Sequence, residues 1–172
     1  MSLPPPDLHP WSTAYEGPPF LPGCTRRPAP LNWPAQEPGG ACSPDLVADE
    51  AWRRSPAYLV GWRCYSAGRF WEAHEAWESA WQASRRAGLE PQAAHLRCLI
   101  QVAAAALKLR LGQPETARVL LARAEQNARA AGNDAQLGIK LESWLARWRS
   151  LLSSPHADWR ARPAGPIVLA SA

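Results

Sequence analysis

The sequence predicts an all-α protein: a compact bundle of about five helices in antiparallel hairpins, preceded by an extended, proline-rich N-terminal arm. Two observations carry this prediction. Thirteen of the 18 prolines fall in the first 56 residues, and proline is excluded from helix interiors and central strands. Beyond Ser55, apolar residues recur at helical spacing between glycine breaks, and no alternating strand pattern competes.

Proline and glycine mark the ends of the first three helices. Ser55 is a good capping residue and Pro56 suits the first helical position, so a helix is expected over 56–67. A second helix is expected over 69–86 and a third over 91–111, each followed closely by a glycine.

The last two helices complete the domain. Pro114 begins a fourth helix that lasts to the Gly132-Asn133 break, and an apolar stripe of leucine and tryptophan predicts a fifth that ends near Ser153. The chain then divides into an arm (1–54), a helical domain (55–153) and a tail (154–172). The arm is partly docked or disordered, and its large apolar side chains favour docking of some part of it; these are Trp11, Tyr15, Phe20, Leu21 and Trp33.

Composition narrows the class of protein. A chain of 172 residues suits one domain, and its ten tryptophans predict an aromatic core. The net charge of +4 is scattered, which makes a nucleic-acid partner unlikely. The longest apolar run, 102–107, is too short for a membrane span. Four cysteines without metal-type spacing, and no secretory signal, lead us to expect free thiols and a cytoplasmic location.

The second predicted helix carries the chemically informative residues. An α-helix advances about 100° per residue, which places His74 and Glu78 on one face among aromatic side chains, with Glu72 on the opposite side. We therefore expect the imidazole and the carboxylate to lose water on folding and to need partners. The aromatic neighbours within about 60° of His74 are Phe70, Trp71, Trp77 and Trp81.

Three interpretations of His74 and Glu78 remain open. They are ligands of one divalent metal ion, an acid/base pair for a small substrate, or a buried structural network. Trp71, Glu75, Trp81 and Gln101 are the candidate ligand-binding or supporting residues, although Gln101 also fits the solvent side of its helix. His95, on another face of that helix, is expected to be exposed. No catalytic residue is assigned, and the sequence leaves open whether the protein is an enzyme.

A faint repeat offers an alternative of a different class. Gly61, Gly68 and Ala73 sit at tetratricopeptide-like spacings, with an echo 44 residues downstream instead of the regular 34. The alternative function is a protein-interaction module, with either a protein partner or a second copy of the chain, in which His74 and Glu78 only stabilise the core.

The motifs of the helical domain resemble domain of unknown function family 309 over about residues 55–152. The resemblance rests on His74-x-x-x-Glu78-x-x-Trp81, on the preceding Gly68-x-Phe70-x-Glu72-Ala73, and on Leu99-Ile100-Gln101-x-Ala103-Ala104. It implies a small all-helical protein of bacteria and archaea with no established activity. It also implies a suggested metal-binding role for His74 and Glu78, with one divalent ion as the cofactor. Pro19 to Gly23 resembles a turn in the arm of some members, but the histidines expected further along that arm are absent.

Overall fold

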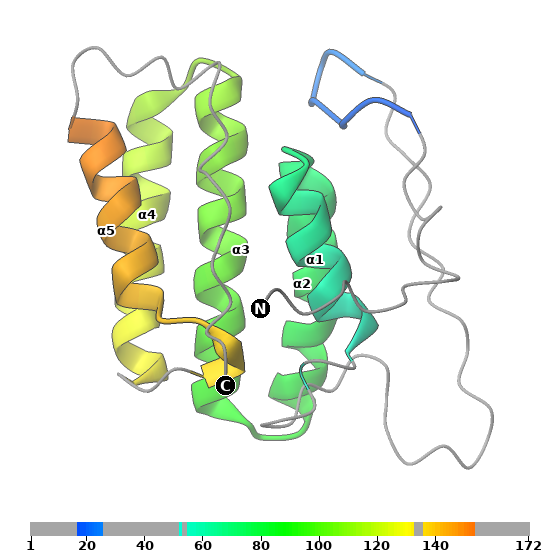
Figure 1. Cartoon of the computed structure of the whole chain (residues 1–172), viewed down its shortest axis with the longest axis vertical. Coiled ribbons are helices and arrows are strands. Elements are labelled where there is room, and N and C mark those ends of the chain that lie inside the picture. Colours follow the sequence, from blue (N-terminus) through cyan, green and yellow to red (C-terminus); the bar gives the residue numbers. More distant parts are fainter. Residues whose placement is uncertain (1–16, 26–51, 53–54, 133–135, 154–172) are drawn as a thin grey trace, which may run out of the picture.

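The structure is a computed structural model that describes residues 17–25, 52, 55–132 and 136–153, and within these residues it contains helices and no strand (Figure 1). The all-α prediction is therefore confirmed, and each predicted helix lies within a few residues of its observed position. The helices are α1 (Pro56–Ser66), α2 (Phe70–Arg86), α3 (Glu90–Arg110), α4 (Pro114–Ala131), the short 3-10 helix η3 (Gln136–Gly138) and α5 (Leu141–Ser153).

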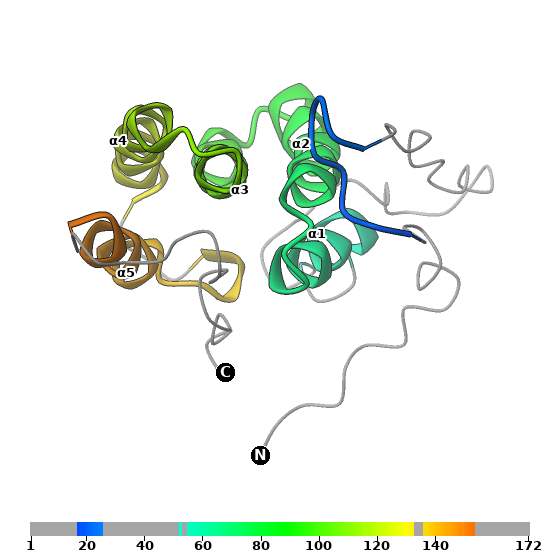
Figure 2. The ribbon, with the colours of Figure 1, turned by 90° about the horizontal axis from the view of Figure 1, so that it is seen from above.

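The helices form two layers. Figure 2 shows α2, α3 and α4 in one row, with α1 beside α2 and α5 beside α4 on the same side of that row. Helices that follow one another from α1 to α4 pack together, and the connections between them are short, as in antiparallel hairpins. The central helix, α3, therefore has a neighbour on each side, α2 and α4.

The helix ends follow from local chemistry. The Ser55 hydroxyl accepts a hydrogen bond from the Tyr58 N–H at 3.3 Å, and Pro56 occupies the first turn of α1, where a missing N–H costs nothing. Gly68, with φ of +72°, turns the chain after α1, and the N–H of the next residue returns to the Cys64 carbonyl. A left-handed φ of this size favours glycine because a Cβ would crowd the backbone.

Aromatic rings fill the core between α1, α2 and α5. The Trp62 ring meets four others with centroid separations of 4.7 to 6.1 Å, namely Tyr58, Tyr65, Trp77 and Trp144. Trp77 is fully buried and donates its indole N–H to the Tyr58 carbonyl at 3.2 Å. A Cβ at Gly61 would lie 2.1 Å from Trp77 Nε1, so only glycine allows α1 to approach α2 this closely.

A short segment of the arm, residues 17–25, lies beside α2 (Figure 2). The Phe20 ring packs edge-on against Trp71 with centroids 4.8 Å apart, and the Phe20 N–H donates to Glu72 Oε1 at 3.0 Å. Arg69 donates to the Gly17 carbonyl from the same helix edge. Trp11, Tyr15 and Trp33 of the arm, and the tail 154–172, lie outside the described residues.

Tyr58 ties α1 to the connection between α4 and α5. Its buried hydroxyl donates to the Leu137 carbonyl, and burial raises its pKa far above the ordinary range. Leu137 has a φ of +52°, a left-handed conformation that costs a non-glycine residue about 1–2 kcal/mol. The hydrogen bond and the buried leucine side chain hold this strained residue in place.

Candidate functional site

Three potential metal ligands gather on one face of α2. His74 Nδ1 lies 3.6 Å from Glu75 Oε1 and 3.9 Å from Glu78 Oε2. One ligand atom from each residue lies within 4.8 Å of the other two, and within the described ranges this is the one such group of histidine, cysteine or acidic residues. The spacing explains the convergence, since Glu78 lies about one turn after both His74 (i, i+4) and Glu75 (i, i+3) and therefore brings the two together.

The three side chains are half-buried, with exposed fractions of 30% for His74, 33% for Glu75 and 39% for Glu78. The expectation that His74 and Glu78 lose their water on folding is therefore wrong. Its physical reason lies in the small residues of α2: Ala73, Ala76 and Ala80 are fully buried and allow α1 and α3 to pack closely. The alanine side of the helix faces the core, and the His74 side lies at the edge.

The Nδ1 atom of His74 is shielded from solvent, although the side chain as a whole is partly exposed. His74 Nδ1 has almost no solvent contact, and no hydrogen bond reaches it within the described part of the chain. Its distances to Glu75 and Glu78 exceed those of ordinary hydrogen bonds. This nitrogen lies near two carboxylates without a hydrogen bond to either, which is an arrangement that a bound metal cation would stabilise.

The predicted supporting residues flank this group but do not bond to it. Trp71 and Trp81 are half-buried, one before and one after the three ligand candidates on α2. Gln101 is half-buried on α3, and its Oε1 is shielded from solvent without a hydrogen-bond partner. Among the described residues, no hydrogen bond or ion pair connects Gln101 to the three ligand candidates.

Glu72 is a buried charged residue whose role the sequence did not reveal. Its side chain has 0% exposure, and Oε1 accepts from the Phe20 N–H and lies 3.2 Å from Arg69 Nη2. Its Oε2 has no hydrogen-bond partner among the described residues. Burial, and secondarily the Glu72 carboxylate, raise the pKa of the neighbouring Cys64 thiol to about 12. The i, i+3 spacing of Arg69 and Glu72 was the available signal for this pair.

His95 is also buried, with 1% exposure, so the expectation of an exposed histidine is wrong. Burial lowers its pKa to about 3, because an imidazolium loses its hydration there. The reason is the central position of α3, whose neighbours cover sides that would be exposed on an outer helix. Cys64 and Cys98 are buried free thiols and Cys24 is an exposed one, as expected.

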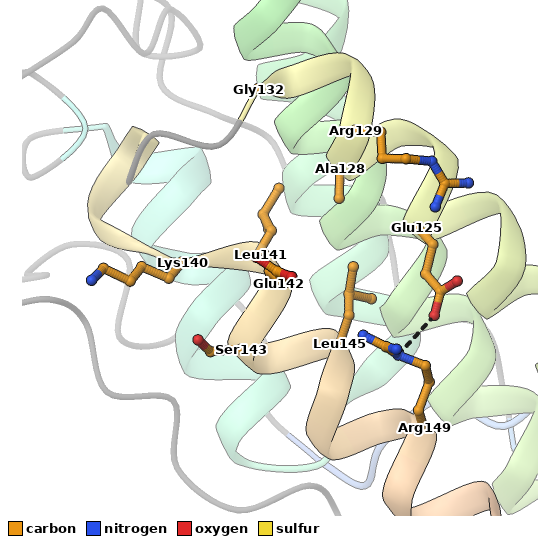
Figure 3. A pocket seen from close by; sticks show the side chains of 10 residues that line it. All are labelled: Glu125, Ala128, Arg129, Gly132, Lys140, Leu141, Glu142, Ser143, Leu145 and Arg149. Carbon is orange, nitrogen blue, oxygen red and sulfur yellow. Dashed lines mark ion pairs between the residues drawn. The ribbon is translucent and has the colours of Figure 1, made fainter.

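Two surface hollows are lined by residues other than His74, Glu75 and Glu78. One of about 420 Å³ lies between α4 and α5, and the Arg149 to Glu125 ion pair of 3.1 Å crosses it (Figure 3). Figure 3 shows Arg129 and Lys140 extending in opposite directions, so the cations at its rim do not converge. The other, of about 400 Å³, is lined by Trp81, Gln82, Arg85 and Arg86 at the end of α2.

The fold and the site define a small all-helical domain with a His-Glu-Glu group on its second helix. Residues 58–120 match the family model described as Domain of unknown function (DUF309), which confirms over these residues the resemblance predicted from the sequence. The match contains all three ligand candidates and Gln101. No curated protein and no solved structure matches the chain. No helix within the described ranges is long and apolar enough to cross a membrane.

Proposed function

We propose that this domain binds one divalent metal ion through His74 Nδ1 and carboxylate oxygens of Glu75 and Glu78. The observation that supports the proposal most is the shielded, unsatisfied His74 nitrogen between two carboxylates. Most shielded polar atoms in proteins are hydrogen-bonded, and a cation bound by His74 and the two carboxylates would give this nitrogen a partner. The proposal assigns binding and no reaction.

The distances between the three ligand atoms fit the binding of one shared metal ion. Metal ligands lie about 2.1 Å from a first-row divalent ion, so two ligands of one ion are at most about 4.2 Å apart. The two separations from His74 Nδ1, 3.6 and 3.9 Å, fall within this limit. The third separation is below 4.8 Å and needs only a small rotation of a half-exposed carboxylate.

The types of ligand atom and their exposure indicate which metal ions suit this site. One imidazole and two carboxylates suit zinc, manganese, iron or cobalt better than calcium, which prefers oxygen ligands alone. Three protein ligands on one helix face leave the solvent side of an ion open to water or to a small ligand. Trp71 and Trp81 precede and follow the three ligand candidates on α2, and both are half-buried.

The test is metal analysis of the tag-free full chain, purified without chelator, followed by calorimetric titration of chelator-treated protein with Zn²⁺ and Mn²⁺. His74→Ala and Glu78→Gln are compared with Glu115→Gln, which neutralises an exposed helical glutamate outside the group. We expect near-stoichiometric metal in the parent and in Glu115→Gln, and its loss in the other two variants. A parent without metal affinity, or equal affinity in all four proteins, would refute the proposal.

A further inference from the structure

Two arginines from different helices share the ring of Trp81. The guanidinium carbon of Arg85, on α2, lies 5.2 Å from the ring centroid, and that of Arg97, on α3, lies 5.3 Å from it. Both arginines are exposed, whereas the indole is half-buried. The two positive charges are thus held no more than about 10.5 Å apart.

No carboxylate in the described part of the chain forms an ion pair with either arginine. The ion pairs of the described residues involve neither Arg85 nor Arg97, and Glu78, one turn before Trp81, approaches His74 instead. Both guanidinium groups therefore keep their positive charge available to an anion, with the indole as their shared neighbour. Cations in the last turn stabilise a helix C-terminus, which accounts for Arg85 and Arg86 on α2, but not for Arg97 in the middle of α3.

A hollow of about 400 Å³ lies at the end of α2, and Trp81, Gln82, Arg85 and Arg86 line it. Arg97 does not line this hollow, but its guanidinium lies over the ring of Trp81, which does. This volume accommodates a small molecule. Arginine donors fit phosphate oxygens two at a time, and three positive charges match a di- or triphosphate better than a single carboxylate.

We propose that Trp81, Arg85, Arg86 and Arg97 form a binding site for the phosphate groups of a small, water-soluble phosphate ester or diphosphate. The proposal stands on these arginines and does not need the metal. Trp81 is three residues after Glu78, a rise of about 4.5 Å along the helix, so a bound phosphate would lie beside the proposed metal site.

The test uses the full chain freed of metal by chelator and titrated calorimetrically with inorganic pyrophosphate. Arg97→Gln and Arg85→Gln each remove one guanidinium group, and Arg147→Gln on α5 is the matched control, because it also replaces an exposed helical arginine. We expect binding by the parent and the control. Each of the other two variants should bind about tenfold more weakly, the loss that follows from removing a charge-assisted hydrogen bond. Unchanged circular dichroism shows that the surface variants remain folded.

The same proteins are tested with phosphatidylglycerol vesicles and with a single-stranded oligonucleotide. Pyrophosphate binding that falls in Arg97→Gln and Arg85→Gln but not in Arg147→Gln supports the small-phosphate site. No binding of pyrophosphate, equal losses in all three variants, or binding of only the vesicles or the oligonucleotide would overturn it. None of these outcomes depends on whether metal analysis finds an ion.

Discussion

Glutamate and histidine occur in two contrasting places in this domain. Glu72 and His95 lie in the interior with 0% and 1% exposure, whereas His74 and Glu78 are 30% and 39% exposed at the edge of α2. The interior glutamate binds the arm and Arg69, so it serves the fold. At the edge, His74 Nδ1 lies near two carboxylates and has no hydrogen-bond partner among the described residues. Residues of the same type therefore have different environments in this domain, and the proposed ligand-binding role falls to the edge pair.

A substitution at the closest contact between α1 and the interior side of α2 is expected to lower the free energy of unfolding the most. Gly61→Ala places a Cβ 2.1 Å from Trp77 Nε1, on a rigid indole that is itself buried and hydrogen-bonded to Tyr58. We expect the free energy of unfolding to fall by about 3 kcal/mol or more, the upper range for overpacking a core. Urea unfolding followed by far-ultraviolet circular dichroism measures it. Wild-type stability would show that α1 and α2 are not packed this tightly.

Replacing Glu72 should lower the free energy of unfolding nearly as much as Gly61→Ala does. Glu72→Ala removes the acceptor of the Phe20 N–H and leaves Arg69 without its carboxylate, and breaking a buried ion pair costs about 3 kcal/mol. Arg69 is 14% exposed and can recover some hydration, so the loss should be somewhat smaller than that of a fully buried pair. Unfolding of Glu72→Ala beside Glu75→Ala measures the contrast. Equal losses in the two variants would mean that the interior and edge carboxylates do not differ.

Because His95 is buried, the free energy of unfolding is expected to fall in acid. Its folded pKa of about 3 lies below the ordinary value of 6.5, so between these values the unfolded chain binds more protons. The stability is therefore fully present above pH 6.5 and declines as the pH falls towards 3. By pH 5 this histidine alone should cost about 2 kcal/mol.

The measurement is the free energy of unfolding at pH 7 and pH 5 for the parent and for His95→Leu. The leucine variant should lose about 2 kcal/mol less than the parent between these two values, whatever its stability at pH 7. An identical decrease in the two proteins would show that His95 is not the buried group that titrates.

The smallest stability effect is expected at the edge of α2. His74→Ala removes contacts to two half-exposed carboxylates, and such exposed pairs contribute at most about 1 kcal/mol. In metal-free protein the melting temperature should therefore change little. A large loss without metal would assign His74 a structural role like that of Glu72.

The order of the helices was predictable from local signals. Pro56 and Pro114 begin helices, a glycine follows each of α1, α2, α3 and α4, and the leucine-tryptophan stripe of α5 gave its position. The family was recognisable from the motif residues, and residues 58–120 match it. These features depend on residues close together in the sequence, where propensity and capping chemistry act directly.

The buried side of α2 was not predictable in the same way. Its aromatic residues suggested that the His74 side faces the core, but Ala73, Ala76 and Ala80 are the residues that permit close helix contact. The contact of Phe20 with Glu72 spans 52 residues and depends on where the arm returns to the domain. Such contacts follow from three-dimensional packing, which no local pattern encodes.

The central claim is that the edge histidine, and not the interior one, is the ligand-binding imidazole. Nitrogen-15 nuclear magnetic resonance of the histidine side chains, recorded while Zn²⁺ is added to chelator-treated protein, tests it most directly. We predict a large shift of His74 Nδ1 that saturates near one equivalent, and no change in the His95 signals. Unchanged His74 signals at excess Zn²⁺ would contradict the claim and leave His74 as a surface ion-pair partner of Glu75 and Glu78.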